Sequence, residues 1–254
     1  MLKKFDCLKF AADTFSNSKD EIIEEAPLSI FVNGRYFVTV MISPQMVKEF
    51  VVGHLFSERI IKGIKEIESL QIEGNIAKVI IPNNPLRLSA AKRLIVSGCG
   101  GTSSFLDGSQ YQKVRSDLKT SVENIFKSVK EILKSNLHRV TGGVHSVGLF
   151  DSNGTICISE DIGRHNALDK VIGYRLNTGF EDTFVACTGR TSSEMVLKCA
   201  VANIPLIIST GATTSLAIEI AENTGLTIIG FVRGNRMNVY TGWGRICRTD
   251  TQGR

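Results

Sequence analysis

The 254-residue sequence lacks the long apolar run of a membrane protein and the leader of a secreted one. No apolar stretch reaches the roughly 18 residues that a membrane-spanning helix needs, so no membrane span is expected. The first four residues carry two lysines, but no apolar stretch and cleavage site follow them. The sequence therefore predicts a cytoplasmic protein.

Aromatic residues and strong charge are also scarce. Trp243 is the only tryptophan, and the formal net charge is +5. No dense basic stripe with interleaved aromatic residues is present, so nucleic acid is not an expected partner. The mild positive charge leaves two interpretations open, a site for an anionic ligand and an ordinary solvated surface.

Paired cysteines are absent as well. No two cysteines have C-x-x-C or zinc-ribbon spacing, and without a leader a disulfide framework is not expected. The six cysteines are Cys7, Cys99, Cys157, Cys187, Cys199 and Cys247. Most of them are expected to be small, buried apolar residues.

The first part of the chain combines short strand-like runs with one helical pattern. Two of these runs are joined by Asn33-Gly34, a strong hairpin signal. Ser43-Pro44 resembles an N-cap with proline at the first helical position, and an apolar face at helical spacing follows. We predict a smaller α+β domain over residues 1–115.

From about residue 116 the pattern alternates between helix and strand. The expected order is a helix over 122–137, strands at 144–150 and 156–159, a helix near 166–174, a strand at 183–187, a helix near 194–202, a strand at 206–209, a helix near 214–223 and a strand at 226–231. Such alternation predicts an α/β layered sheet that is at least partly parallel. We assign it to a second domain over residues 116–254.

Cys99 has neighbours unlike those of the other cysteines. Glycines at 98, 100 and 101 remove side chains around its thiol, and polar residues follow. Thiolate chemistry needs access and a lowered pKa, and the nearby Lys92 and Arg93 favour the thiolate. The pattern is compatible both with a reactive thiol and with an inert cysteine in a glycine turn.

Two further segments carry charged side chains at turns. In the segment 160–170, Asp161, Arg164 and His165 lie between a strand and a helix, where α/β proteins bind ligands. The alternative is an ordinary helix start with Asn166 as its cap. In the second segment Arg233-Gly234-Asn235-Arg236 follows a strand, which suits either an anion site or a plain surface hairpin.

Three other patterns are weaker. The loops 141–145 and 188–194 also lie at strand ends and are candidates for the same site, the second with a helix start that offers N–H groups to an anion. His54 and Glu58 are four residues apart on a predicted helix. A shared metal is one interpretation, and a partly buried histidine beside an exposed acid is the other.

Longer strings in the sequence resemble the FdhD family of formate dehydrogenase accessory sulfurtransferases. The most distinctive are EDIGRHNALDKVIG at 160–173 and FVRGNRMNVYTG at 231–242. The strings TGGVHSVGLF (141–150), TGRTSSEMVLKCA (188–200) and EAPLSIFVNG (25–34) follow the same pattern and order. The resemblance extends from about residue 25 to residue 242.

The resemblance implies a fold and a function that composition does not reveal. It implies a C-terminal domain like that of cytidine deaminases and a homodimer. It also implies a carrier that takes persulfide sulfur from a cysteine desulfurase and passes it to the molybdenum bis(molybdopterin guanine dinucleotide) cofactor of formate dehydrogenase. No permanent cofactor and no bound metal are expected.

Residue roles follow from the same resemblance. Cys99 would carry the persulfide. The guanine dinucleotide part of the cofactor would lie against Phe231, Val232, Arg233, Gly234, Asn235 and Arg236. Asp161, Arg164 and His165 would line the cofactor site or manage protons. The sequence departs from the family at Thr102, where many members have a second cysteine, so a dithiol mechanism within this loop is not available.

Two other functions have different sequence requirements. A chaperone that delivers the cofactor without passing sulfur would need the arginine turn but not Cys99. A zinc deaminase would need H-x-E and P-C-x-x-C. Neither motif occurs, which excludes the deaminase. The sequence does not distinguish molybdenum from tungsten or identify the formate dehydrogenase.

Overall fold

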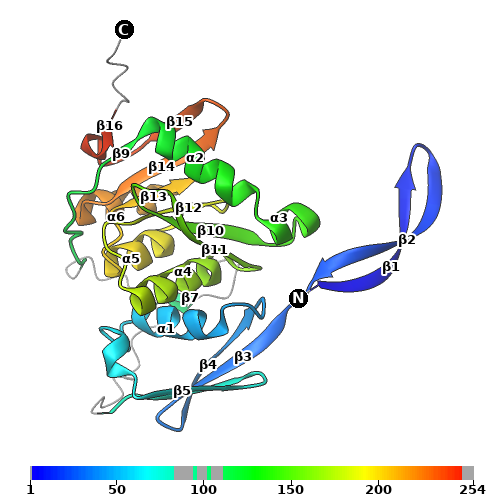
Figure 1. Ribbon diagram of the computed structural model, residues 1–254, viewed down its shortest axis with the longest axis horizontal. Helices are drawn as coiled ribbons and strands as arrows, with labels where there is room; N and C mark the ends of the chain where they lie inside the picture. The colour runs from blue at the N-terminus through cyan, green and yellow to red at the C-terminus, as the bar shows by residue number, and fades with distance from the viewer. Residues whose placement is uncertain (1, 83–93, 96–101, 104–110, 248–254) are drawn as a thin grey trace.

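The computed structural model describes residues 2–82, 94–95, 102–103 and 111–247. These residues form a four-stranded sheet with one helix, a six-stranded sheet with helices on both faces, and a two-stranded hairpin that stands away from both (Figure 1). This arrangement confirms the predicted α/β class with a smaller N-terminal α+β part. The closer likeness to cytidine deaminases stays an expectation.

The small sheet has the strand order β4-β3-β6-β5. Its strands are β3 (Ala26–Val32), β4 (Arg35–Ile42), β5 (Ser69–Glu73) and β6 (Ile76–Ile80). As predicted, Asn33 and Gly34 form the turn between β3 and β4, and both have positive φ, 50° and 76°. One face of the sheet packs against helix α1 (Val47–Ser57) around Ile30, Phe50 and Leu55.

The start of α1 differs from the prediction. The N-cap is Met46 in the left-handed conformation, and the Ser43-Pro44 pair lies outside the helix. Ser43 is fully buried, and its hydroxyl accepts a hydrogen bond from the N–H of Ile162 at 3.2 Å. The predicted N-cap role of Ser43 is therefore wrong, because its hydroxyl bonds to a distant part of the chain instead of to α1.

The large sheet has the order β11-β10-β12-β13-β14-β15, with β12, β13 and β14 parallel to one another. Its strands are β10 (His145–Phe150), β11 (Thr155–Asp161), β12 (Phe184–Cys187), β13 (Leu206–Ser209), β14 (Thr227–Arg233) and β15 (Arg236–Val239). The partly parallel sheet was predicted. The antiparallel edges arise from the hairpins β10–β11 and β14–β15.

Helices cover both faces of the large sheet. On one face lie α4 (Arg164–Thr178), α5 (Ser193–Val201) and α6 (Ser215–Thr224), which share an apolar core with the strands. On the other face α2 (Val122–Leu133) contributes Ile125 and Ile132 to a separate core. The predicted helix 122–137 is broken in two. The backbone of Ser135 is extended, and a short second helix, α3 (Asn136–Thr141), begins after it.

Two helices join the small and large sheets. α1 and α4 cross where Gly53 faces Gly173, and a Cβ on either glycine would collide with backbone of the other helix. The carbonyl oxygen of Asp169 occupies the space at Gly53, and that of Glu49 occupies the space at Gly173. Only glycine permits this approach, so the two residues set how closely α1 and α4 pack.

Charged groups are buried at the same junction. Asp169 of α4 accepts hydrogen bonds from Ser57 at 2.8 Å and from Lys198 of α5 at 2.7 Å, and its other contact is Nδ1 of His54 at 3.0 Å. Burial works to raise the pKa of Asp169, but the Lys198 charge and the His54 hydrogen bond outweigh it and lower the pKa to about 2. Three helices are thus linked through one carboxylate.

The remaining described segments are short or peripheral. β1 (Leu2–Ala11) and β2 (Thr14–Ile23) form the projecting hairpin, and η1 (Ile64–Glu66) and η3 (Trp243–Arg245) are single 3₁₀ turns. The short strands β9 (Thr120–Ser121) and β16 (Ile246–Cys247) pair in parallel with each other. In the part of the chain that the structure covers, no helix has the length and apolarity to span a membrane.

The chain just before residue 116 is attached to the large-sheet unit. The N–H of Val114 donates to the carbonyl of Thr224 at 2.8 Å, and the N–H of Arg115 donates to the side chain of Asn203 at 2.8 Å. Tyr111 and Val114 pack against the core under α4, α5 and α6. The domain boundary at residue 115 stays a prediction.

Candidate functional site

Two loops leave the carboxyl ends of β12 and β13 and are bound to each other. The N–H of Thr191 donates to the carbonyl of Ala212 at 2.9 Å, and the N–H of Thr214 donates to the carbonyl of Thr191 at 3.2 Å. Each loop leads into a helix, with Ser192 as the N-cap of α5 and Thr214 as the N-cap of α6. Two helices therefore begin side by side at the carboxyl ends of these strands. The positive dipole ends at their N-termini favour anions.

Exposed arginines lie along this edge. Arg190 and Arg233 are both exposed, and the Nε of Arg233 donates to the carbonyl of Thr210 in the loop after β13 at 3.2 Å. The backbone N–H of Phe231 donates to Gly211 at 3.0 Å, and Phe231 itself has a positive φ of 52°. These bonds hold the predicted arginine segment against the loop after β13, which is itself bound to the loop that carries Arg190.

The segment Arg233–Arg236 forms a two-residue hairpin turn. Arg233 pairs with Arg236 across it, and Gly234 has a positive φ of 56°. The structure thus has the surface hairpin that the sequence allowed as an alternative. Val232 is buried under the turn, whereas Phe231 is 38% exposed, so of these two only the aromatic ring faces solvent.

His165 lies inside helix α4, in its first turn. The N-cap is Gly163, so the alternative of a cap at Asn166 is wrong: the Asn166 side chain instead donates to Asp161 at 2.9 Å. His165 is only 8% exposed, and its Nε2 is 3.2 Å from the hydroxyl of Ser192 and 3.1 Å from a carboxylate oxygen of Glu194. Burial, reinforced by the charge of Arg164, lowers the pKa of His165 to about 3.

The half-buried His145 brings the loop 141–145 to the same edge. A Cβ added to Gly189 would lie 3.1 Å from its Nδ1 and 3.0 Å from the Cβ of Arg164, which shows how closely these segments pack. Burial and then the charge of Arg164 lower the pKa of His145. The structure therefore brings together the loops 141–145 and 188–194, Arg164, His165 and the arginine turn.

Asp161 differs from the other predicted site residues. It is fully buried, and its two oxygens accept hydrogen bonds from the N–H of Ser43 at 3.0 Å and of Gly163 at 2.9 Å, and from Lys170 at 2.7 Å. All of these partners, and the side chain of Asn166 that also donates to Asp161, belong to the chain itself. The role of Asp161 in ligand binding stays a prediction, while its contacts fasten the small sheet's end to α4.

The five described cysteines differ in accessibility. Cys99 lies outside the described residues, between the paired strands β7 (Leu94–Ile95) and β8 (Thr102–Ser103). Burial raises the pKa of Cys157 to about 12 and that of Cys187 to about 11, and it raises the pKa of Cys199 as well. These three thiols are therefore poor candidates for a substitute thiolate.

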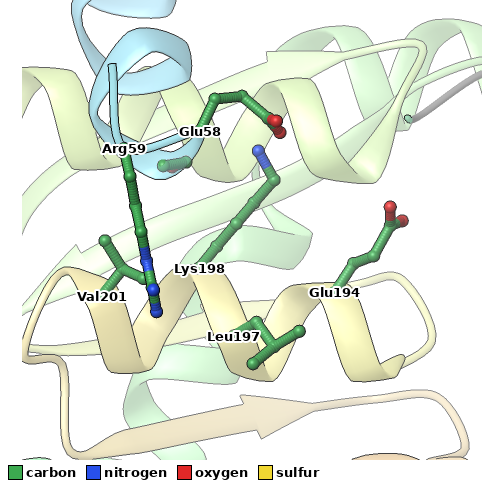
Figure 2. Close-up of a pocket in the computed structure, with 7 residues that line it drawn as sticks. Glu58, Arg59, Glu194, Leu197, Lys198 and Val201 are labelled. Atoms are coloured by element: carbon green, nitrogen blue, oxygen red, sulfur yellow. The ribbon is translucent and has the colours of Figure 1, made fainter. Parts of the chain in front are cut away.

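A pocket opens beside the buried junction, between the end of α1 and the outer face of α5 (Figure 2). Its lining residues are Ser57, Glu58, Arg59, Glu194, Leu197, Lys198 and Val201. The carboxylate of Glu58 points toward the ammonium group of Lys198. Glu194 lines the pocket and also contacts His165, so it connects the pocket with the strand-end loops.

The metal interpretation of His54 and Glu58 is not supported. His54 contacts Asp169 rather than sharing a site with Glu58. Within the described ranges, no three His, Cys, Asp or Glu side chains are grouped so that they would hold a metal ion.

Sequence reasoning recognised the helix start in the loop 188–194, but it assigned no binding role to Arg190, Ser192 or Glu194 individually. The signal was present, because Ser192 and Glu194 have the spacing of a helix start directly after a buried strand. The pairing of Glu194 with His165 could not be read from the sequence, because 29 residues separate them.

Comparison with known proteins identifies the family of this chain. The model of the family described as FdhD/NarQ matches residues 23–247. Relatives named sulfur carrier protein FdhD include those of Bacillus pumilus, 36% identical over 91% of this chain and 92% of the relative, and Saccharolobus solfataricus, 36% identical over 94% and 96%.

A solved structure gives the same result. A crystal structure from Desulfotalea psychrophila, whose chain is named as a formate dehydrogenase accessory protein, has a TM-score of 0.82 and 27% identity, covering 97% of this chain and 99% of that one. Since the family model spans most of the sequence and the relatives match nearly end to end, this chain belongs to the FdhD/NarQ family.

Proposed function

We propose that this protein is a sulfur carrier that serves formate dehydrogenase. It receives sulfur on Cys99 from a cysteine desulfurase and passes it to the molybdenum bis(molybdopterin guanine dinucleotide) cofactor before the cofactor enters the enzyme. The observation that carries the proposal is the match to the FdhD/NarQ family over residues 23–247, together with relatives named as sulfur carriers. The cytoplasm and a homodimer remain the expected setting.

The choice of Cys99 is supported by the state of the other thiols. Three of the five described cysteines have thiols whose pKa is raised by burial. Cys7 lies on the projecting hairpin and Cys247 on β16, and neither strand belongs to the large sheet. Cys99 is the cysteine with glycines on both sides, which favour access to the sulfur.

One thiol is sufficient for the loading step. The Cys99 thiolate attacks the terminal sulfur of the donor persulfide, the donor's sulfur–sulfur bond breaks, and the donor cysteine leaves as a thiolate. The product is a persulfide on Cys99, and no oxidant is consumed. The absence of a second cysteine at Thr102 therefore does not prevent loading.

The strand-end edge has the chemistry to hold the nucleotide part of the cofactor as a substrate. Arg190 and Arg233 present exposed guanidinium groups, which pair well with phosphate oxygens. The N-termini of α5 and α6 add backbone N–H groups. The exposed ring of Phe231 is available to stack on a guanine base.

The proposal is tested by intact-protein mass spectrometry after incubation with a cysteine desulfurase and cysteine. Wild type is expected to gain about 32 Da, the mass of one sulfur atom, and Cys99→Ala is expected to gain none. Cys247→Ala, which removes another exposed thiol, is the matched control and should load like wild type.

The same experiment addresses the runner-up function. A wild-type protein that binds the cofactor but never gains sulfur would refute sulfur transfer and favour a chaperone. A Cys99→Ala variant that still gains sulfur would refute the assignment of Cys99.

A further inference from the structure

The contact between His165 and Glu194 determines where the imidazole carries its proton. Nε2 is 3.1 Å from the Glu194 carboxylate, which as an anion only accepts hydrogen bonds. The hydroxyl of Ser192, 3.2 Å from Nε2, can donate or accept a hydrogen bond, so it is compatible with a proton on Nε2. His165 is uncharged because burial holds its pKa at about 3. Its single ring proton therefore lies on Nε2.

This arrangement leaves Nδ1 as an acceptor. The residue is 8% exposed, and Nδ1 has no hydrogen-bond partner among the described residues. Buried polar side-chain atoms nearly always have a partner, and leaving one unmade costs free energy. A ligand that carries an N–H or O–H donor could bind at the carboxyl edge of the sheet and give this acceptor its missing partner.

We propose that Glu194 is a positioning residue that holds His165 in the Nε2–H tautomer, so that Nδ1 accepts a hydrogen bond from an N–H or O–H group of the bound cofactor. The inference rests on the proposed function, because it assumes a cofactor at this edge. It replaces the idea of His165 as a proton carrier. An imidazole that stays neutral recognises a donor and does not shuttle protons.

The position of the pair indicates which part of the cofactor supplies the donor. His165 and Glu194 lie at the starts of α4 and α5, whereas Arg233 ends β14, two strands away from β12. Adjacent strands are about 5 Å apart, so the separation is roughly 10 Å. If Arg233 and Phe231 hold the guanosine diphosphate, the donor at His165 belongs to the pterin end and not to the guanosine.

The tautomer is measured directly by ¹⁵N NMR of histidine side chains. The protein has four histidines, and the His165 signals are identified as those lost in His165→Asn. Wild type is expected to show a protonated Nε2 and an unprotonated Nδ1. Glu194→Ala should shift His165 toward a tautomer mixture, and Glu194→Gln should largely restore the Nε2–H form through its amide oxygen. A wild-type His165 protonated on Nδ1 would refute the inference.

Binding separates the two nitrogens. In His165→Gln the side-chain amide can reach the position of Nε2 and keep the Glu194 contact, while the Nδ1 acceptor is lost. In His165→Asn the amide can supply an acceptor near Nδ1. Affinity for the whole cofactor, released anaerobically from formate dehydrogenase, should fall about tenfold in His165→Gln, as for one unmade buried hydrogen bond, and less in His165→Asn.

Guanosine diphosphate is the second probe. Its affinity should be the same in wild type and in both His165 variants, because the arginine end is intact. Equal affinity of all three proteins for the whole cofactor would refute the role of Nδ1, and a parallel loss for guanosine diphosphate would place the donor on the guanosine. A wild type that binds neither probe would refute the proposed function instead.

Discussion

The α1–α4 junction and the strand-end edge use similar side chains in opposite ways. At the junction, buried charges have internal partners: Asp169 has Lys198, His54 and Ser57. At the edge, Arg190 and Arg233 are exposed, and Nδ1 of the buried His165 has no described partner. A buried polar group whose hydrogen bonds are all made within the protein stabilises the fold, whereas a buried polar group that lacks a hydrogen-bond partner indicates a ligand. Polarity alone does not distinguish a structural cluster from a functional one.

The strongest way to break the junction is to remove the cation from its centre. Lys198→Met should destabilise the protein by about 3–5 kcal/mol, because it leaves the buried Asp169 charge short of a partner. Urea denaturation at neutral pH measures the loss. Adding Asp169→Asn should recover part of it, and a double variant no more stable than Lys198→Met would contradict the explanation.

The helix crossing should respond nearly as strongly. Gly173→Ala places a methyl group against the carbonyl oxygen of Glu49, so α1 and α4 must separate, at a cost of roughly 3 kcal/mol. Thermal unfolding detects the change. Gly63→Ala is the control, because its backbone is extended and no atom lies within 4 Å of an added Cβ. Similar losses in both variants would show that the crossing is not special.

The buried His165 makes stability depend on pH. Its pKa is about 3 in the fold against 6.5 for the ordinary side chain, so the unfolded chain takes up the proton first. The stability is therefore complete above pH 6.5 and is lost as the pH falls toward 3. Between pH 6.5 and about pH 5, wild type should lose roughly 2 kcal/mol more than His165→Gln. Denaturation curves at both pH values check this, and parallel losses would argue against a neutral His165.

Changes at the exposed edge should affect ligand binding without affecting the fold. Arg233→Ala should weaken binding of guanosine diphosphate several-fold, most clearly at low salt, and change stability by less than about 0.5 kcal/mol. Isothermal titration calorimetry measures the affinity. Arg35→Ala, which removes an exposed arginine from the small sheet, should bind like wild type. Equal weakening in both would indicate a general charge effect.

The smallest effect is expected for ion pairs in solvent. Lys78 and Glu73 are 2.7 Å apart but both well exposed. Lys78→Ala should therefore change stability by less than about 0.5 kcal/mol, in contrast to Lys198→Met. Measuring both variants under the same conditions tests whether burial, and not the short distance, sets the strength of a pair.

Local signals in the sequence predicted much of this fold. Asn33-Gly34 specified a hairpin turn, and alternating patterns predicted the layered sheet from residue 116. Contacts between distant residues could not be predicted in this way. Ser43 serves Ile162 instead of its own helix, and Asp169 meets Lys198 across 29 residues.

The candidate site was predicted in part. Arg164, His165 and the arginine turn do lie at strand ends, as expected. Asp161, from the same segment, instead binds the backbone of Ser43 and the side chain of Lys170, because the side chains at a strand-to-helix turn face different sides. Cys99 lies outside the described residues, and its role stays a prediction.

The projecting hairpin offers a practical handle on this protein. β1 and β2 pair along their whole length, and the turn at Ala12-Asp13 has positive φ at both residues, 47° and 59°. None of its residues belongs to the three apolar cores, and the family match begins only at residue 23. Loop tips of this kind tolerate insertions. A fluorescent label at the tip should therefore report the arrival of a partner protein while leaving the strand-end edge unmodified.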